Sequence, residues 1–437
     1  MVKVRFAPSP TGKIHIGNTR IAILNWLFAR KHGGHFLLRS DDTDMARSTS
    51  EFEQGILNDM QWLGLNHDSY AKQSDNITRY DEVLKHLKAI GRVYACYETA
   101  EELDIKRKLQ QSQGKPPVYD RASLKLTDAE KALKKEQGIQ PHWRFLLNDD
   151  VIEWNDLSRG HTRFESGHLS DPVLVRADGR YLYTLSSVVD DIDMNITHII
   201  RGEDHTTNTA TQVQLFEALG ASVPTFAHMA LIVGKSGEKQ SKRLGTGAIE
   251  TLRESGLESI TVVSALARIG SSFMPDGTDT LDGLIENFDI GAFSKNSPKF
   301  DTDDLFALNS KAIHNMSYSD IKDKLDVSVS EEIWNTIHCN INLISDTKAW
   351  VETLTGDIET VIKDADFITT AKSLLPDGDI TLDTWKVWTS AVKDATGTKG
   401  KELFMPLRLA LTGLSHGPEM GKVLPILGRE KILKRLG

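Results

Sequence analysis

The stretch of residues 5–44, RFAPSPTGKIHIGNTRIAILNWLFARKHGGHFLLRSDDTD, constrains the fold more than any other part of this chain. β-Branched and aromatic side chains over residues 2–6 predict a strand, and two prolines then end it. Apolar residues at helical spacing predict a helix over about 18–31, which two consecutive glycines terminate, and residues 35–39 predict a second strand. Strands joined by a helical crossover are usually parallel, so the loop after the first strand and the acidic segment after the second should meet at one sheet edge. Open α/β sheets bind ligands at that edge.

The loop between the first strand and its helix has the composition of an anion site. Gly12 and Gly17 allow the backbone to approach a ligand closely, and Ser9, Thr11 and His15 offer hydrogen-bond donors just before a helix N-terminus. The loop does not contain the G-x-G-x-x-G pattern of dinucleotide-binding proteins. Taken alone, His15 could be a core or surface histidine, so these residues by themselves predict an anion site and no particular ligand.

The wider pattern around this loop resembles that of a known family. The residues SPTG-x-x-HIGN resemble the HIGH signature of class I aminoacyl-tRNA synthetases, in the form found in the glutamyl and glutaminyl enzymes, with Asn18 in the last position. Because several independent positions agree, we interpret His15 as a functional residue.

Residues 81–190 depart from the parallel-sheet pattern. A charged helix near residue 81 is followed by a basic helical segment over 101–111 and by segments such as HWRFLL, VIEWNDL and DPVLVRADGRYLYTL, which predict short strands separated by turns. The residues alone permit an independent small domain, whereas the resemblance implies an insertion that holds the acceptor end of tRNA.

Some glutamyl enzymes carry zinc in this insertion. Here Cys96 has only Glu98 nearby and no further Cys/His pair follows, so we expect no structural zinc.

The parallel pattern resumes at residues 196–200, a predicted strand followed by the charged turn that contains Arg201 and Asp204. A helix is predicted over 209–219, and the segment FAHMALIVG predicts another strand. This second βαβ unit mirrors the first, so its charged turn should converge on the same sheet edge.

The next loop, KQSKR, places Lys239, Lys242 and Arg243 within five residues. A solvated charge run is the usual explanation of such a stretch when it stands alone. The loop also resembles the KMSKS signature of the same synthetase class, close to the KLSKR form of the glutamyl enzymes, with Lys242 as the second lysine and Gln240 in place of the usual apolar residue. Adenylation requires cations near the α-phosphate and the departing pyrophosphate, and a loop of this kind can supply them.

Beyond residue 246 the pattern is mainly helical, and the basic residues of the last ten positions could be either a solvated helix end or an RNA contact. With the resemblance, we predict an α/β protein: a Rossmann-like parallel-sheet catalytic domain with an α/β acceptor-binding insertion, followed by an all-helical C-terminal anticodon-binding region. The predicted domains are the first half of the catalytic domain (1–80), the inserted acceptor-binding domain (81–190), the second half with the KQSKR loop (191–245), a helical stem-contact region (246–317) and a helical anticodon-binding region (318–437).

Composition restricts the partners and the compartment. A chain of 437 residues with 39% hydrophobic and 26% charged residues has the composition of a soluble globular protein. Its net charge of -9 argues against non-specific coating of nucleic acid but permits a specific RNA partner bound by one basic face. Cys96 and Cys339 cannot form a disulfide framework, and no signal-peptide pattern is visible, so we expect a reducing cytoplasm. The family resemblance implies a monomer.

Carried over residue by residue, the resemblance implies a set of residues for each substrate. His15 and Lys242 would be catalytic, Asp41 would hold the α-ammonium group of glutamate, and Arg5 and Arg201 would pair with its carboxylates. A neutral glutamine amide could not replace those charge-assisted contacts equally well. From the residues alone, Arg5, Asp41 and Arg201 could form a structural ion-pair network, and Tyr183 could be a core residue of a YLYTL strand. The implied glutamate site comprises Arg5, Ala7, Ser9, Asp41, Tyr183, Ser187 and Arg201, and the implied ATP site comprises Ser9, Thr11, Gly12, His15, Gly17, Asn18, Asp204, Leu231, Ile232, Lys239, Ser241 and Lys242.

The resemblance thus implies a glutamate–tRNA ligase that uses ATP with Mg²⁺ to form glutamyl-adenylate and transfers the glutamyl group to the 3′ end of tRNA(Glu). No side-chain nucleophile and no protein-bound metal are required, because positioning and electrostatic stabilisation carry such a reaction. Two alternatives remain open from the sequence: an enzyme that misacylates tRNA(Gln), and a catalytically silent tRNA-binding paralogue. A truncated relative that modifies a tRNA base is disfavoured because the helical C-terminal region is present.

Overall fold

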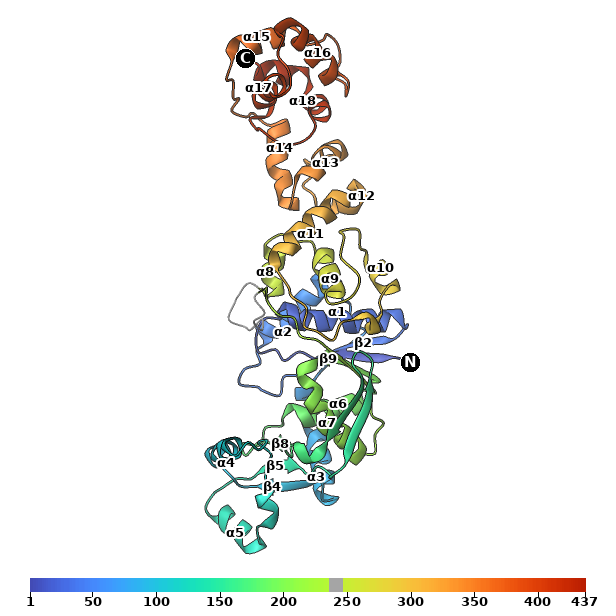
Figure 1. The fold of residues 1–437 in the computed structure, drawn as a ribbon, viewed down its shortest axis with the longest axis vertical. Coiled ribbons are helices and arrows are strands. Elements are labelled where there is room, and N and C mark those ends of the chain that lie inside the picture. Colours follow the sequence, from blue (N-terminus) through green and yellow to red (C-terminus); the bar gives the residue numbers. More distant parts are fainter. Residues whose placement is uncertain (236–246) are drawn as a thin grey trace. The chain divides into compact units, whose positions relative to one another are not determined.

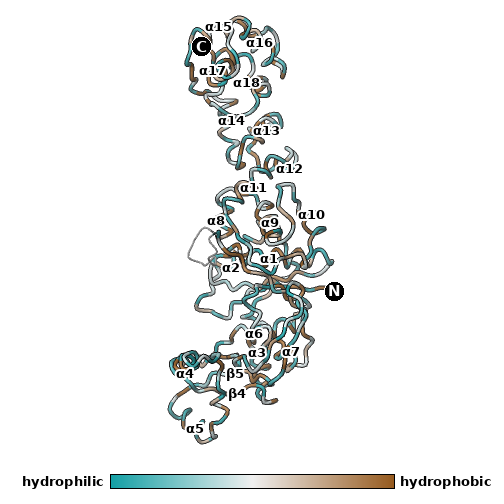
Figure 2. Tube along the Cα trace, viewed as in Figure 1, coloured by the Kyte–Doolittle hydropathy of each residue, from teal (hydrophilic) through white to brown (hydrophobic). Residues whose placement is uncertain are grey.

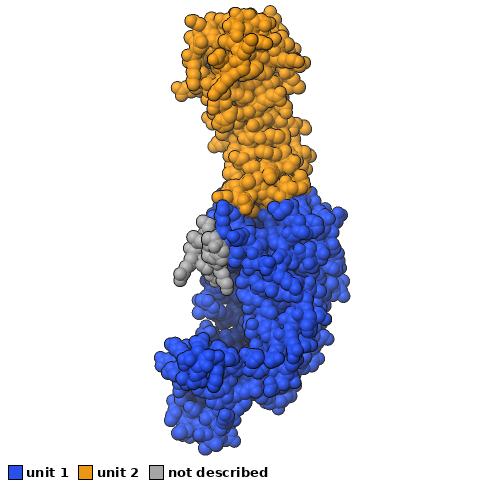
Figure 3. Space-filling model, viewed as in Figure 1, with its two compact units in different colours: residues 1–255, 262–274, 279–302 blue, residues 256–261, 275–278, 303–437 orange. Residues whose placement is uncertain are grey.

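The computed structural model describes residues 1–235 and 247–437, which form two compact units. The first unit comprises residues 1–255, 262–274 and 279–302, and the second comprises residues 256–261, 275–278 and 303–437 (Figure 3). The five-part division expected from the sequence is finer than these two units and stays a prediction.

The first unit is built on parallel strands. β1 (Lys3–Phe6), β2 (His35–Ser40) and β3 (Ser69–Lys72) form one sheet in the order β1-β2-β3, and β9 (His198–Gly202) pairs in parallel with β10 (Thr225–Met229) (Figure 1). The Thr197 N–H donates to the Lys3 carbonyl over 2.9 Å, which joins the second pair of strands to β1. The chain therefore runs outward from β1 to β3 and returns to the other side of β1, which creates a switch point for ligand binding between β1 and β9.

The helix after β1 begins two residues earlier than its apolar spacing predicts. α1 spans Ile16–Lys31, because the His15 side chain accepts the Gly17 N–H and caps the helix. Its apolar residues are buried, and Asn25 is buried among them with its amide donating to the Ile21 and Ile200 carbonyls at 2.8 and 2.9 Å. The second bond ties α1 to β9. The other helices of the parallel layer are α2 (Ser50–Trp62), α3 (Ile77–Ala89), α6 (Tyr183–Asp193) and α7 (Thr206–Ala218).

The prediction of a strand at YLYTL is wrong, because Tyr183 is the first residue of α6. Leu185, Val188 and Val189 are all buried, and their spacing is that of one helix face. A run of five residues is too short to reveal that period, so the alternation of Tyr and Leu imitates a strand.

The insertion is a mixture of helices and antiparallel strands, as expected. It contains a three-stranded sheet in the order β4-β5-β8 and a hairpin of β6 and β7. The Leu157 N–H, just after β6, donates to the Phe226 carbonyl of β10 at 2.9 Å, which fixes the hairpin against the parallel layer. The elements are β4 (Val93–Cys96), α4 (Ala100–Ser112), α5 (Asp128–Glu136), β5 (His142–Phe145), β6 (Val151–Asp156), β7 (Gly160–Glu165) and β8 (Val173–Val175).

The rest of the described chain is helical, which confirms the predicted class of the C-terminal region. Hydrophobic residues occur throughout both units (Figure 2), and in the second unit they pack around Trp334 and Trp388, both fully buried. Among the helices formed by the described residues, none combines the length and apolar character that crossing a bilayer requires. The helices are α8 (Ile249–Glu254), α9 (Ser259–Arg268), α10 (Leu281–Glu286), α11 (Thr302–Asn315), α12 (Tyr318–Ile321), α13 (Glu331–Ile337), α14 (Thr347–Thr355), α15 (Ala365–Ser373), α16 (Thr384–Thr396), α17 (Lys401–Thr412) and α18 (Met420–Arg435).

The basic residues at the end of α18 hold the helix in place. Lys431 donates to the Thr355 carbonyl, Lys434 forms a salt bridge with Asp357 at 2.6 Å, and Arg435 donates to the Leu411 carbonyl at 2.6 Å. These bonds support a structural role for the three side chains.

Candidate active site

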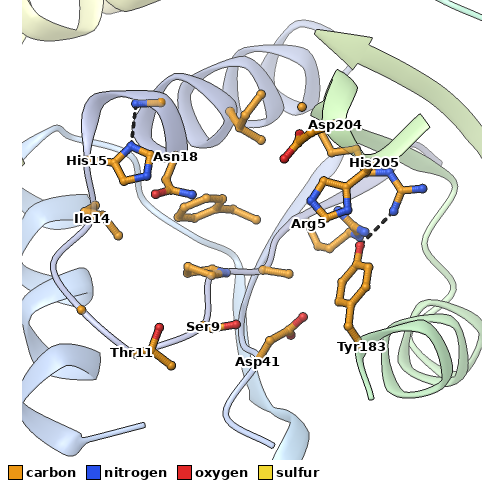
Figure 4. Close-up of a pocket in the computed structure, with 18 of the residues that line it drawn as sticks. Arg5, Ser9, Thr11, Ile14, His15, Asn18, Asp41, Tyr183, Asp204 and His205 are labelled. Atoms are coloured by element: carbon orange, nitrogen blue, oxygen red, sulfur yellow. Dashed lines mark hydrogen bonds between the residues drawn. The ribbon is translucent and has the colours of Figure 1, made fainter. Parts of the chain in front are cut away.

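A cavity of about 770 Å³ opens at the carboxyl ends of β1, β2 and β9, where both βαβ units contribute side chains. Ser9 and Asp41 come from the segments that follow β1 and β2, and they face Tyr183 at the start of α6 and Asp204 and His205 in the turn after β9 (Figure 4). The two charged turns therefore converge as predicted. The sequence-predicted residues that line the cavity are Arg5, Ala7, Ser9, Thr11, Gly12, His15, Gly17, Asn18, Asp41, Tyr183, Arg201, Asp204, Leu231 and Ile232.

One predicted residue, Ser187, does not line this cavity, and three others belong to the residues that the structure does not describe. Ser187 is fully buried on α6, does not line the cavity, and accepts a hydrogen bond from Arg39 at 3.3 Å. Its predicted contact with glutamate stays a prediction. In the structure Ser187 is linked to the cavity through Arg39, which also donates to Asp41. Lys239, Ser241 and Lys242 lie outside the described residues.

The glycine-rich loop presents the N-terminus of α1 to the cavity. The His15 Nδ1 accepts the Gly17 N–H at 3.1 Å (Figure 4), so a neutral imidazole in this position carries its proton on Nε2. A Cβ atom at position 17 would lie 3.0 Å from the His15 ring, so a larger residue there would push the ring from its present position. The imidazole, the nearby glycines and the helix N-terminus thus lie together at the cavity, and the anion site expected from them stays a prediction.

Beneath the other end of the cavity lies a buried ion-pair network. Arg5 Nε donates to Asp191 at 3.0 Å, and Arg39 donates to Asp191 at 2.8 Å and to Asp41 at 2.7 Å. The alternative that Arg5 and Asp41 belong to such a network is therefore correct, yet both residues also line the cavity. Arg39 and Asp191 were not identified from the sequence as members of this network. The signal was the presence of charged residues in two apolar runs, Arg39 in HFLLRS and the aspartates in SSVVDDID, because buried charges must pair.

Asp41 is the most strongly perturbed carboxylate that lines the cavity. Burial raises its pKa to about 6, against the opposing effect of the Arg39 guanidinium, and Asp190 nearby also raises it. Asp190 itself accepts bonds from Gln73 and Tyr80, both at 2.8 Å. The Arg39 salt bridge therefore offsets only part of the cost of burying the Asp41 charge, and an ammonium group bound beside it would further stabilise the ionised form.

Arg201 lines the cavity and is held by hydrogen bonds from three of its nitrogen atoms. Its Nη2 donates to Thr209 and Gln212 at 2.5 and 2.7 Å, its Nε donates to His228 at 3.3 Å, and its Nη1 donates to the Tyr183 hydroxyl at 2.8 Å. A guanidinium has five N–H groups. One Nη1 N–H therefore has no hydrogen-bond partner among residues 1–235 and 247–437.

No carboxylate of the described residues forms a salt bridge with Arg201, although only 5% of this residue is exposed. Burial lowers its pKa, and the charge of Arg5 lowers it further. Burial alone would raise the pKa of Tyr183, but the two guanidiniums offset this effect and lower it. The pKa of His205, whose ring centroid lies 5.4 Å from that of Tyr183, falls to about 4 through burial and the Arg201 charge. A carboxylate bound at this end of the cavity would therefore supply the partner that Arg201 does not have among the described residues.

The backbone at Leu231 and Ile232 is fixed by two charged residues that the sequence did not single out. Glu203 accepts the Leu231 N–H at 3.1 Å, and Arg20, which is 2% exposed, donates to the Ala230 carbonyl at 2.6 Å. These two bonds hold the segment in place, and its other backbone groups, such as the Ile232 N–H, can face a flat heterocycle.

The predicted absence of a zinc site in the insertion stays a prediction. Cys96 is buried and donates to the Tyr119 hydroxyl, which in turn donates to Glu98 at 2.7 Å. Within the part of the chain that the structure describes, no three His, Cys, Asp or Glu side chains are grouped as a metal site requires. Stoichiometric zinc in a metal analysis of the purified protein would contradict the prediction.

Comparisons with known proteins agree with the geometry. The family model described as tRNA synthetases class I (E and Q), catalytic domain, matches residues 1–307, and a model described as an anticodon binding domain matches residues 346–437. A glutamate–tRNA ligase 1 of Maricaulis maris is 51% identical over 440 residues, covering 100% of this chain and 99% of the relative. A glutamate–tRNA ligase of Azospirillum brasilense is 47% identical, covering 100% and 98%.

Among solved structures, the chain is similar to a glutamate tRNA ligase from Elizabethkingia meningosepticum in complex with its amino acid. The two share 26% sequence identity and a TM-score of 0.87, and the match covers 100% of this chain and 98% of that one. The resemblance inferred from the two short motifs is thereby confirmed over the whole length. This chain belongs to the class I tRNA synthetases of the E and Q type, and it is an aminoacyl-tRNA synthetase.

Proposed function

We propose that the cavity binds L-glutamate at its cationic end and ATP at the α1 end, so that the chain acts as a glutamate–tRNA ligase. The observation that carries this proposal is Arg201, a buried guanidinium beside Arg5 with no carboxylate partner among the described residues. A buried charge without a partner is unfavourable, and the side-chain carboxylate of glutamate would supply that partner. Glutamine, which is neutral, would leave Arg201 uncompensated.

The remaining groups of the cavity then orient glutamate. Asp41 accepts the α-ammonium group, which leaves the α-carboxylate directed toward the loop of Ser9 and His15. As a class I tRNA synthetase, the chain uses ATP. ATP would place its phosphates at the N-terminus of α1, its ribose near Asp204 and its base against the backbone of Leu231 and Ile232.

The first chemical step joins the two substrates. An α-carboxylate oxygen of glutamate attacks the α-phosphorus of ATP, and the bond to pyrophosphate breaks. The Nε2 N–H of His15 stabilises the charge that develops on the phosphate oxygens, and Lys242, which lies outside the described residues, would act on the same charge. In the second step, a ribose hydroxyl of the terminal adenosine of tRNA attacks the carbonyl carbon of the adenylate, and AMP leaves.

Mg²⁺ would accompany ATP. Divalent magnesium prefers hard oxygen ligands and commonly binds to phosphates with one or two protein carboxylates. When bound, the ion would neutralise charge on the phosphates.

The tRNA partner is tRNA(Glu), and the same chemistry would serve an enzyme that also acts on tRNA(Gln). We further propose that the chain works as a monomer in the cytoplasm. Both cysteines are unpaired in the structure, in agreement with a reducing compartment.

Exchange of radioactive pyrophosphate into ATP tests this proposal. The exchange is measured with glutamate or glutamine, and with no tRNA, purified tRNA(Glu) or purified tRNA(Gln). We expect glutamate-dependent exchange that requires tRNA(Glu). Exchange with tRNA(Gln) as well would identify a misacylating enzyme, and no exchange with any tRNA would identify a silent paralogue and refute the proposal.

A further inference from the structure

A buried carboxylate–imidazole pair lies behind Arg201, outside the cavity. Asp156, the last residue of β6, and His228, in β10, are 4% and 0% exposed. The His228 Nδ1 lies 2.5 Å from Asp156 Oδ2, and the His228 backbone N–H donates to Asp156 Oδ1 at 3.1 Å. Neither residue lines the cavity.

The pair determines which nitrogen of His228 carries the proton. An ionised carboxylate only accepts hydrogen bonds, so the Nδ1 of His228 must donate to Asp156. Asp156 also accepts the N–H groups of Ser158 and Arg159, both at 3.0 Å, and its hydrogen bonds outweigh burial and keep its pKa low. A neutral His228 therefore has an unprotonated Nε2.

That Nε2 faces Arg201. It lies 3.3 Å from Arg201 Nε and 2.8 Å from the Thr209 hydroxyl, which also accepts from Arg201 Nη2. Thr209, Gln212 and Tyr183 engage three of the five guanidinium N–H groups, and His228 supplies the acceptor for a fourth, the Nε N–H. If the proton were on Nε2, two donors would face each other and the guanidinium would have to rotate.

We infer that Asp156 and His228 are positioning residues that orient Arg201 toward the side-chain carboxylate of the substrate. The inference rests on the proposed function. Asp156 fixes the tautomer of His228, His228 fixes the plane of Arg201, and that plane directs the remaining Nη1 N–H into the cavity. The pair resembles the carboxylate–imidazole arrangement of hydrolytic triads, but here it serves substrate binding and moves no proton in the reaction.

The inference predicts a specific kinetic change. Asp156→Asn keeps the shape of the side chain and its acceptor for the backbone N–H groups, but its amide N–H₂ would donate to His228 Nδ1 and move the imidazole proton to Nε2. We expect the KM for glutamate to rise roughly ten- to hundred-fold, the range for one hydrogen bond to a charged group, with the KM for ATP changed less than about two-fold.

Two substitutions at His228 provide a matched pair. His228→Asn retains a donor for Asp156 but cannot reach Arg201, whereas His228→Gln can place its amide oxygen where Nε2 accepts the Arg201 N–H. We expect the Asn variant to raise the KM for glutamate and the Gln variant to remain close to wild type. A structural role alone would affect both variants alike.

The control is Asp171→Asn, which changes a carboxylate that is equally buried and accepts bonds from Tyr94, Arg121 and the Leu147 N–H away from the cavity. Its KM for glutamate should be unchanged. All variants are assayed as full-length protein by pyrophosphate exchange with tRNA(Glu). If Asp156→Asn does not fold, the two His228 variants decide the question.

The outcomes separate this inference from the proposed function. A wild-type chain without glutamate-dependent exchange refutes the proposed function and the inference with it. An active wild type together with an unchanged glutamate KM in Asp156→Asn and His228→Asn, or an equal rise in His228→Asn and His228→Gln, overturns the inference alone.

Discussion

Replacing Arg201 by glutamine should remove the selectivity for a negatively charged amino acid. Arg201 is 5% exposed and forms no salt bridge with the described residues, so the substrate carboxylate is the partner that we assign to it. Glutamine at this position removes the positive charge while leaving polar atoms near Thr209 and Tyr183. The neighbouring Arg5 keeps its salt bridge with Asp191 and can still meet the substrate.

The magnitude follows from what each substrate loses. Breaking a buried ion pair costs about 3–5 kcal/mol, and the lower end applies because glutamate keeps its contact with Arg5. Glutamine loses an ordinary hydrogen bond worth about 1 kcal/mol. The difference of about 2 kcal/mol corresponds to a loss of selectivity of roughly 30-fold, with kcat/KM for glutamate itself falling roughly 150-fold.

The assay is pyrophosphate exchange with tRNA(Glu), in which kcat/KM is measured for glutamate and the inhibition constant is measured for glutamine as a competitor. Arg30→Gln is the matched control, because Arg30 forms a salt bridge with Asp68 outside the cavity. Its kinetics should match the wild type. If Arg201 selects the substrate by its charge, the ratio of glutamate affinity to glutamine affinity must fall roughly 30-fold in Arg201→Gln. That electrostatic role would be refuted if this ratio stayed within about three-fold of the wild-type ratio.

Three further perturbations address other parts of the cavity. Lys242→Ala should slow adenylate formation strongly and leave glutamate binding, measured by calorimetry, largely intact. Loss of glutamate binding would contradict the assignment of Lys242 to ATP and not to glutamate. Because burial raises the pKa of Asp41 to about 6, its carboxylate takes up a proton as pH falls through that value, so kcat/KM for glutamate should fall below about pH 6 and Asp41→Asn should abolish that dependence. In Gly17→Ala the new Cβ would lie 3.0 Å from the His15 ring, so the KM for ATP should rise several-fold with little change for glutamate, whereas equal changes for both substrates would argue against a phosphate role for His15.

The first βαβ unit could be predicted because its signals are local. Prolines end β1, His15 and the following glycine begin α1, and the apolar spacing of α1 is regular over four turns. The positions of the loop residues then follow from topology, since both crossover loops must lie at the carboxyl edge of the sheet. These residues line the cavity as expected.

The partners of buried charges could not be predicted, because they are distant in sequence. Arg39 and Asp191 are separated by 152 positions, and Asp156 and His228 by 72. An apolar run that contains a charge indicates a buried pair but does not identify the other member. Ser187 illustrates the reverse case: its place in the family pattern suggests a substrate contact, yet on the buried face of α6 its hydroxyl accepts from Arg39.

The mass of the product tests the central claim most directly. The protein is incubated with ATP, Mg²⁺, purified tRNA(Glu) and equal concentrations of glutamate and glutamine. The terminal nucleoside of the tRNA is then released with ribonuclease, and its mass is measured by mass spectrometry. We expect glutamyl-adenosine without detectable glutaminyl-adenosine, because only glutamate neutralises Arg201. Glutaminyl-adenosine in comparable amount, or unmodified adenosine alone, would contradict this expectation.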